Sequence, residues 1–266
     1  MILGFLGCGN ISSVIVNYLI HSHLDIQPKY FFDKFTDKSK SLSSLVNGVV
    51  VKDFNRMLNK VDIVFEAASP SAIKEYGLNI VNSGKSLIIM SVGSLMDKNF
   101  SEDLIQVAEK KYVKIYVPSG AVIGLDGIKS ASIGNLYSVS LITRKPPKAL
   151  NQNENIEKVV FEGKASEAIK KFPLNMNVAV SLSLVANKDI DVKIISDPSI
   201  SQNIHQIDVK GDFGQFSTRI SNSPCRSNPK TSLLAAYSAI NLFEKLDKNL
   251  YIGVKLKSRD FKLIII

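Results

Sequence analysis

The chain has 266 residues, 45% hydrophobic and 21% charged, which is the composition of an ordinary globular protein long enough for two domains. Its two cysteines, Cys8 and Cys225, exclude a disulfide framework and a metal quartet, so we expect a cytoplasmic protein without a metal site. The formal net charge is +9, but the lysines are scattered among acids and no run is long enough to cross a membrane; we expect neither nucleic acid nor membrane as a partner.

The N-terminal segment has the pattern of a dinucleotide-binding unit. Six mostly apolar residues predict a strand, Gly7 and Gly9 predict a turn, and apolar residues at helical spacing follow. In such a unit the first glycine makes the turn and the second lets the backbone approach a pyrophosphate at the helix N-terminus, here Asn10 and Ile11. Ser12 stands where a third glycine is usual, so we expect a slightly looser contact between helix and strand.

The second predicted strand, Lys29 to Asp33, ends in an acid. Asp33 follows Gly9 by 24 residues, about where a carboxylate accepts hydrogen bonds from the adenosine ribose of a dinucleotide. The alternative is a helix cap or a loop acid. Lys34 comes next and can pair with a 2′-phosphate, so both NAD and NADP remain open as cofactors.

Two further strands, 61–66 and 86–90, are each followed by small or apolar residues: Ala67, Ala68 and Ser69 after the first, Ser91 and Val92 after the second. Small residues let a ribose or nicotinamide lie against the backbone; the alternative is an ordinary loop with Pro70 in the first helical turn. Strands alternating with helices as far as a last strand at 114–117 predict a doubly wound parallel sheet, an α/β Rossmann domain over residues 1–118.

The pattern changes after that strand. Pro118 ends it, and Ser119 and Gly120 are expected to turn tightly and expose N–H groups before a helix that begins near Ala121 and ends near Ser132. A helix start after a strand end is where parallel α/β sheets bind ligands. The alternative is a turn that only joins two domains.

The second half contains longer alternating strands, predicted over residues 136–144, 158–162, 191–195, 203–210 and 215–221. In one of them, alternation places His205 on the same face as Ile207 and Val209. Such a histidine is either a satisfied core residue or a functional residue beside the nicotinamide. Asn175 either caps a helix or presents its amide to a ligand.

The closing segment, residues 227–232, predicts a helix entry with Pro229 in the first turn, and a helix over 233–246 follows. The tail, residues 250–266, is expected to form an added strand or a disordered end.

Taken together, these motifs resemble those of the L-aspartate dehydrogenase family over residues 1–254. They are GxGNI (Gly7–Ile11), EAASP (Glu66–Pro70), PSGA followed by GLD (Pro118–Asp126), TRKPP (Thr143–Pro147), FPLNMNVA (Phe172–Ala179), the hairpin around His205 and NPKTS (Asn228–Ser232). The resemblance implies a homodimer with an N-terminal Rossmann domain and a C-terminal α+β mixed-sheet domain for catalysis and dimerisation, expected over 119–227, then a closing helix (228–249) and the tail.

The resemblance also implies NAD- or NADP-dependent oxidation of L-aspartate to iminoaspartate, which feeds NAD biosynthesis. His205 would be the active-site histidine, and Ala121 and Asn175 would contact the dinucleotide. This agrees with the chemistry, since a histidine titrating near neutrality can accept the proton of the substrate amine or orient its carboxylates.

Binding the carboxylates of the substrate requires cationic or N–H donors, and Ser119, the Gly120 backbone, Arg144 and Lys145 are candidates among which spacing does not choose. Two other functions remain open: another two-domain amino- or hydroxy-acid dehydrogenase, such as a homoserine dehydrogenase-like enzyme, and a non-catalytic NAD-sensing regulator. The regulator would need a nucleic-acid-binding helix pair, which the sequence does not show.

Overall fold

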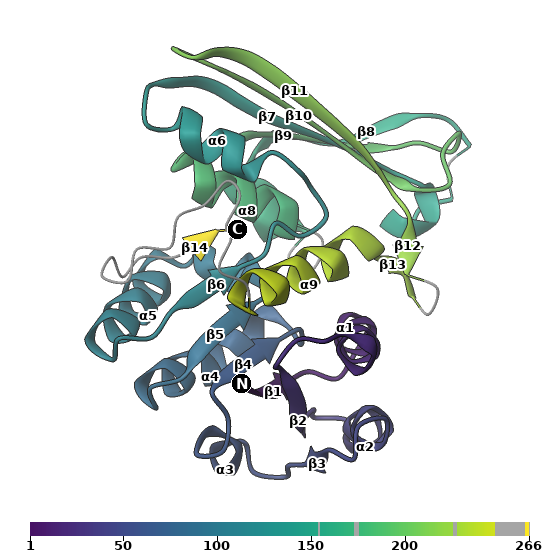
Figure 1. The fold of residues 1–266 in the computed structure, drawn as a ribbon. Helices are drawn as coiled ribbons and strands as arrows, with labels where there is room; N and C mark the ends of the chain where they lie inside the picture. Colours follow the sequence, from purple (N-terminus) through teal and green to yellow (C-terminus); the bar gives the residue numbers. More distant parts are fainter. Residues whose placement is uncertain (154, 173–175, 226–227, 248–263, 266) are drawn as a thin grey trace. The chain divides into compact units, whose positions relative to one another are not determined.

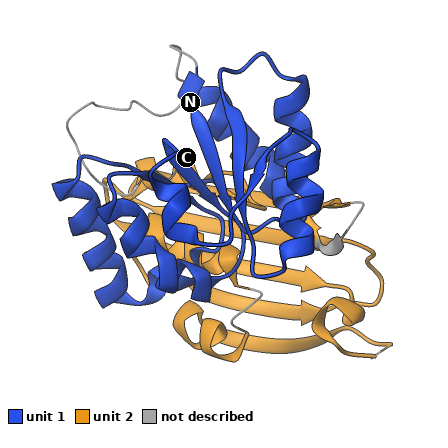
Figure 2. Cartoon of the chain, turned by 90° about the horizontal axis from the view of Figure 1, so that it is seen from below, with its two compact units in different colours: residues 1–118, 235–266 blue, residues 119–234 orange. Residues whose placement is uncertain are grey.

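A computed structural model describes residues 1–153, 155–172, 176–225, 228–247 and 264–265. The chain divides into two compact units, coloured separately in Figure 2. Unit 1 comprises residues 1–118 and 235–266, and unit 2 comprises residues 119–234. Unit 1 is therefore built from two separate stretches of the chain. No helix within the described residues is long and apolar enough to cross a membrane.

Unit 1 holds a parallel sheet whose described strands follow the order β14-β6-β5-β4-β1-β2-β3 (Figure 1). The strands are β1 (Ile2–Leu6), β2 (Gln27–Phe32), β3 (Val49–Val50), β4 (Ile63–Glu66), β5 (Ser86–Ile89), β6 (Ile115–Val117) and β14 (Ile264–Ile265). The chain moves outward in opposite directions from the adjacent strands β1 and β4, which makes this the switch point where doubly wound sheets bind dinucleotides. The predicted Rossmann sheet is confirmed.

Helices connect these strands, as parallel neighbours require. They are α1 (Asn10–His21), α2 (Thr36–Ser44), α3 (Phe54–Leu58), α4 (Pro70–Asn82), the short 3-10 helix η1 (Val92–Met96) and α5 (Lys98–Lys110). The closing helix α9 (Leu233–Asp247) completes the core of this unit.

Aromatic side chains fill the centre of unit 1. Phe5 and Phe31 are fully buried and stack with ring centroids 5.0 Å apart, and Phe65 meets Phe5 edge-on at 5.8 Å. Phe243 of α9 lies 5.9 Å from Phe65, and the Tyr18 hydroxyl of α1 donates to the carboxylate of Glu244. Residues 178 and 226 positions apart thus contact each other, which is why α9 belongs to unit 1.

Unit 2 holds a mixed sheet of order β11-β10-β7-β9-β8. Its strands are β7 (Leu136–Lys145), β8 (Lys158–Lys164), β9 (Asp191–Ser196), β10 (Asn203–Gly211) and β11 (Gly214–Asn222). β7 and β9 run parallel, and the other pairs are antiparallel. The predicted second, mixed-sheet architecture is confirmed.

Helices α6 (Leu125–Ala131) and α8 (Asn177–Ala186) lie along one face of this sheet, and α7 (Ala165–Lys171) packs beside α8 (Figure 1). That face is apolar over most of its length, with Leu141, Ile207 and Val209 buried. The remaining elements are η2 (Pro147–Leu150) and a two-stranded ribbon of β12 (Pro224–Cys225) and β13 (Asn228–Ser232).

The prediction of a helix beginning near Ala121 is wrong, because α6 begins at Leu125. Gly120 has φ +71° and Gly124 has φ +85°, both in the left-handed region. Two left-handed residues interrupt any right-handed helix through this stretch, so the chain makes an irregular turn instead. Ser119 and Gly120 therefore do not stand at a helix N-terminus.

The prediction that residues 227–232 enter a helix with Pro229 in the first turn is also wrong. Asn228–Ser232 is strand β13, paired with β12, and α9 begins at Leu233. The backbone N–H of Leu233 donates to the carbonyl of Ser223, so the extended segment is held by a partner that precedes it in the chain. For the tail, Ile264–Ile265 is an added strand in parallel register with β6.

Candidate active site

The glycine turn of unit 1 follows β1 directly. Gly7 has φ +95°, and a Cβ on it would lie 2.7 Å from the backbone nitrogen of Ala68, so only glycine fits. Gly9 is the N-cap residue of α1, so no side chain hydrogen bonds to the first N–H groups of the helix from this position. The space beside Gly9 is open, because a Cβ built there would have no atom within 4 Å. The positive end of a 12-residue helix, which begins with Asn10 and Ile11, therefore faces open space suited to a phosphate group.

Ser12 closes the contact between α1 and β1. Its side chain is fully buried and its hydroxyl donates to the carbonyl of Gly7 at 2.7 Å. The serine thereby adds a hydrogen bond that braces the glycine turn, while the slightly looser contact between helix and strand stays a prediction.

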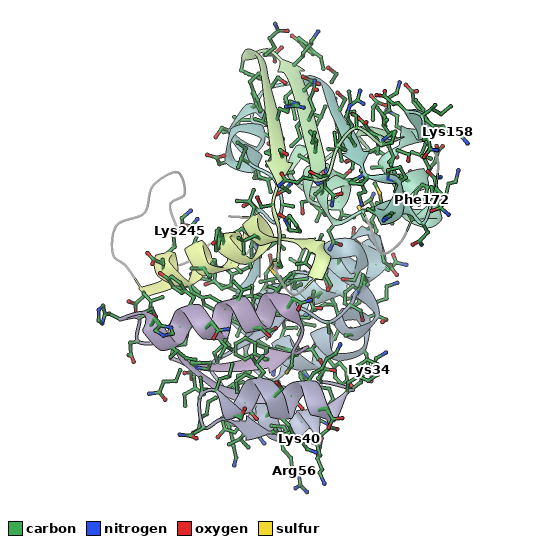
Figure 3. The ribbon with its side chains drawn as sticks, turned by 90° about the vertical axis from the view of Figure 1, so that its right-hand side faces the viewer. Lys34, Lys40, Arg56, Lys158, Phe172 and Lys245 are labelled. Carbon is green, nitrogen blue, oxygen red and sulfur yellow. The ribbon has the colours of Figure 1, made fainter. Side chains whose placement is uncertain are left out.

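Asp33 is held beside this turn by the backbone. Its Oδ2 accepts from the N–H of Cys8 and its Oδ1 from the N–H of Phe35, both at 2.8 Å. Lys34 is exposed at the surface of unit 1 (Figure 3), with its ammonium 4.9 Å from the ring centroid of Phe35. The Asp33 carboxylate is thus fixed by two backbone donors directly after β2.

The loops after β4 and β5 lie at the same edge of the sheet. The N–H of Ala67 donates to the carbonyl of Leu6 at 2.9 Å, which ties the first loop to β1. The hydroxyl of Ser69 caps α4 by accepting from the N–H of Ala72 at 3.2 Å, and Pro70 occupies the first turn. The ordinary capping role of Ser69 is therefore present.

His205 lies on the covered face of the unit 2 sheet, as alternation predicted. It is 6% exposed, and its Nδ1 lies 2.9 Å from the hydroxyl of Thr143, its direct partner across β10 and β7. Burial, and second the charge of Lys145, lowers the pKa of His205 from 6.5 to about 4. The imidazole is therefore neutral at pH 7.

Lys145 shares this face, two residues beyond Thr143 on β7. It is 8% exposed, and burial lowers the pKa of its ammonium from 10.5 to about 8. A buried cation next to a neutral histidine is an arrangement typical of catalytic and binding sites.

Polar side chains continue across this end of the sheet. Lys145 pairs with Ser196 of β9, and Asn203, two residues before His205 on β10, pairs with Asn222 of β11. The Ser196 hydroxyl is buried and has no hydrogen-bond partner within the described residues. A cavity of about 430 Å³ lies here within unit 2, lined among others by Lys148, Asn203, Asn222, Thr231 and Ser232.

The turn that contains Ala121 reaches this same end of the sheet. The side-chain amide of Asn222 donates to the carbonyl of Ala121 at 3.0 Å and accepts from the Ser232 hydroxyl at 2.6 Å. Asn222 thereby joins three segments that lie far apart in the sequence, and it holds the half-buried Ser119–Ala121 turn near the polar end of the sheet.

Arg144 differs from Lys145 in its surroundings. It alternates with Thr143 and Lys145, so its side chain leaves the opposite face of β7. Its guanidinium donates to Glu157 at 2.7 Å and to Asp197 at 3.1 Å, and its hydrogen bond to Glu157 is the largest cause of its raised pKa. Two acids of unit 2 therefore already engage Arg144.

The structure groups the predicted residues by unit. The carboxyl edge of the unit 1 sheet carries Gly7, Gly9, Asn10, Ile11, Asp33, Ala67, Ala68, Ser69, Ser91 and Val92. Unit 2 carries His205, Lys145 and the Ser119–Ala121 turn, with Arg144 on the other face; Asn175 lies outside the described residues. Our sequence analysis missed Thr143, Asn222 and Glu66, and only Thr143 had a signal, its period-2 spacing with Lys145.

A Rossmann sheet with an open glycine turn, and a second mixed-sheet unit with a buried histidine and lysine, define a two-domain dehydrogenase that uses a nicotinamide dinucleotide. Family models agree: residues 7–118 match the NAD-binding domain of homoserine dehydrogenase, and residues 126–246 match the C-terminal domain of aspartate dehydrogenase. The chain belongs to the L-aspartate dehydrogenase family, which confirms the resemblance seen in its motifs.

Its relatives cover nearly the whole chain. L-aspartate dehydrogenase of Methanothermobacter thermautotrophicus is 46% identical over 253 residues, 95% of this chain and 98% of the relative. That of Methanospirillum hungatei is 40% identical, covering 94% and 98%. The crystal structure of aspartate dehydrogenase from Thermotoga maritima matches with a TM-score of 0.77 and 29% identity over 95% of this chain and 99% of that one. A structure of GenD2 with NAD, at 10% identity and a TM-score of 0.60, shares the fold.

Proposed function

We propose that this protein oxidises L-aspartate to iminoaspartate, with hydrolysis to oxaloacetate and ammonia following. When bound, the nicotinamide ring accepts the hydride that leaves the substrate Cα. The observation that carries the proposal is the pair of buried groups on one face of β7 and β10, neutral His205 and cationic Lys145, in a chain whose relatives are L-aspartate dehydrogenases. An amino acid substrate needs a proton acceptor for its amine and a cationic partner for a carboxylate, and these two groups can supply them.

His205 is the proposed proton acceptor. The substrate amine must lose its ammonium proton before an imine can form, and a neutral imidazole can take that proton. Contact with the Thr143 hydroxyl engages Nδ1 and orients the ring, so we assign Nε2 to the substrate amine. The carboxylates of a bound substrate oppose the effect of Lys145 and raise the pKa of His205 toward neutrality, where it is a more effective base.

Lys145 is the proposed partner of a substrate carboxylate. It lies on the His205 face of β7, whereas Arg144 lies on the opposite face. We therefore favour Lys145 over Arg144, with Ser119 and the Gly120 backbone as further donors. Arg144 is better suited to hold Asp197 and the end of β7 in place.

The residues of unit 1 fit a dinucleotide, because there is open space beside the glycine turn: a Cβ built on Gly9 would have no atom within 4 Å. We assign the pyrophosphate to Gly7, Gly9, Asn10 and Ile11, and the nicotinamide half to Ala67, Ala68, Ser69, Ser91 and Val92. Ala121 and Asn175 are assigned to the dinucleotide on the family resemblance. The Asp33 carboxylate repels a 2′-phosphate, so we propose that NAD is preferred over NADP.

We further propose a homodimer formed through unit 2, a cytoplasmic location, and a product that enters NAD biosynthesis, as the family resemblance implies. Cys8 and Cys225 are buried free thiols, which supports a reducing compartment.

The test is the near-ultraviolet absorbance of reduced nicotinamide on mixing the protein with each cofactor and L-aspartate, L-glutamate, L-malate, L-homoserine or L-alanine. We expect turnover with L-aspartate alone, faster with NAD. If another acid of this panel is oxidised and L-aspartate is not, the protein is still a dehydrogenase, but L-aspartate is not its substrate. Dinucleotide binding without turnover on any of these would favour the regulator.

A further inference from the structure

A buried carboxylate that the proposed mechanism does not use lies under the cofactor edge of unit 1. Glu66 is the last residue of β4 and is completely buried, directly before the small residues assigned to the nicotinamide half. Buried carboxylates are costly unless they are hydrogen bonded or paired, so its partners reveal its role.

Glu66 is bonded to two separate loops. Its Oε1 accepts from the N–H of Ala68 at 2.8 Å and of Ser69 at 3.0 Å, in the loop after β4. Its Oε2 accepts from the N–H of Ser91 at 3.0 Å, in the loop after β5, and the Ser91 hydroxyl also hydrogen bonds to this carboxylate. One side chain therefore holds the two loops at a fixed separation.

The same bonds determine what this edge can bind. The N–H of Ala67 is taken by Leu6, those of Ala68 and Ser69 by Glu66, and that of Ala72 by the Ser69 hydroxyl. These donors are consequently not directed at a ligand anion, in contrast to the open N-terminus of α1. The edge suits the nicotinamide riboside of a dinucleotide, and the glycine turn suits its phosphates.

The loop after β4 is also the wall of the glycine turn. A Cβ on Gly7 would lie 2.7 Å from the Ala68 nitrogen and 2.8 Å from the carbonyl atoms of Ala67. The backbone of Ala67 and Ala68 therefore leaves no room for a side chain at position 7. Burial raises the pKa of Glu66, while its hydrogen bonds from Ser91, Ala68 and Ser69 favour the ionised form.

We propose that Glu66 is a positioning residue for the nicotinamide half of the cofactor: its carboxylate fixes the loops after β4 and β5 in the geometry that this half of the dinucleotide requires. The inference rests on the proposed function only in that a nicotinamide dinucleotide binds to unit 1. In a doubly wound sheet β1, β2 and β3 serve the adenosine half, and β4, β5 and β6 serve the other half. Glu66 should therefore affect the two halves unequally.

The experiment measures dissociation constants for NAD and for ADP by calorimetry, without substrate, on the full chain and on Glu66→Gln. In the glutamine variant an NH2 group replaces one of the two carboxylate oxygens. Because both oxygens of Glu66 accept backbone N–H groups, this NH2 donor faces at least one N–H donor in either orientation of the amide. We expect the dissociation constant of NAD to rise about ten-fold, with that of ADP changed less than about two-fold. Asp62→Asn is the matched control. The Asp62 carboxylate also accepts a backbone N–H, that of Ile2, but it lies directly before β4, at the opposite end of the strand from Glu66.

Equal weakening of NAD and ADP would show a general effect on the fold and overturn the proposal, as would unchanged binding of both. If Glu66→Gln fails to fold, Glu66→Asp, which keeps the charge with a shorter reach, is measured in the same way and must show the same selective loss. Failure of both variants to fold would make Glu66 a fold determinant and also overturn the proposal. Because no turnover is involved, these outcomes are independent of whether wild-type protein oxidises aspartate.

Discussion

Lys145→Met should make the protein more stable and less active. Burial lowers the pKa of Lys145 from 10.5 to about 8, so the unfolded chain binds the proton more tightly than the native protein does. At pH 7 this difference corresponds to about 3 kcal/mol of lost stability, at 1.36 kcal/mol per pKa unit. Methionine has a similar shape and carries no charge, so the variant should regain most of this free energy.

The change of stability with pH tests the direction of this pKa shift. Between the two pKa values the unfolded chain carries more protons, so the stability of the wild type rises as the pH rises from about 8 toward 10.5, while that of Lys145→Met does not follow it. The stability gap between the two proteins should narrow from about 3 kcal/mol at pH 7 to about 1 kcal/mol at pH 9.5.

Urea unfolding followed by far-ultraviolet circular dichroism measures this gap. Lys193→Met is the control, because the Lys193 side chain is 34% exposed and its ammonium lies 2.9 Å from the carboxylate of Glu162; its loss should change stability by less than about 1 kcal/mol. A Lys145→Met variant that is no more stable than the wild type at pH 7, or a stability gap that does not narrow with pH, would refute the argument that burial of the Lys145 ammonium lowers the stability of the native protein.

Three further changes test the site. His205→Ala should lower kcat by about 10²- to 10⁴-fold while calorimetry finds the NAD dissociation constant unchanged, since the residue acts on the substrate proton; turnover within a few-fold of wild type would contradict this role. Asp33→Ala should weaken NAD and improve NADP relative to it, and an unchanged ratio of kcat/KM for the two cofactors would count against the contact with the ribose. Asn222→Asp cannot donate to the Ala121 carbonyl, so steady-state kinetics should show a higher KM for L-aspartate; an effect on thermal stability alone would make Asn222 only a structural latch.

Local signals in the sequence were sufficient to predict the glycine turn and the face of the sheet on which His205 lies. Gly7 adopts a left-handed conformation against the Ala68 peptide, a constraint that two spaced glycines after a strand already express. Period-2 alternation placed His205 with Ile207 and Val209, and all three are buried. Such features depend on a few neighbouring residues, which is why they were predictable.

The errors arise where distant parts of the chain decide the conformation. Residues 228–232 have a sequence compatible with a helix entry, but pairing with β12 keeps them extended. The helix predicted from Ala121 ignores two left-handed glycines, Gly120 and Gly124, whose conformation sequence alone does not give. Helix α2 was not predicted, because Thr36–Ser44 is rich in serine and lysine and shows little apolar periodicity.

The buried polar residues were the hardest to find. Glu66 ends a strand of buried residues, and nothing in EAASP indicates that its carboxylate turns inward to two loops. Asn222 gains its role from Ala121 and Ser232, about 100 and 10 residues away along the chain. Roles of this kind depend on tertiary hydrogen bonds and emerge only from the fold.

The central claim is that hydride passes from the Cα of L-aspartate to the nicotinamide ring, and isotope transfer tests it most directly. Wild-type protein is incubated with NAD and L-aspartate deuterated at Cα, and the reduced cofactor is analysed by mass spectrometry and NMR. We predict that it carries one deuterium at C4 of the nicotinamide, with oxaloacetate and ammonia formed in equal amounts. Reduced cofactor without deuterium, or none at all with dinucleotide still bound, would contradict the account.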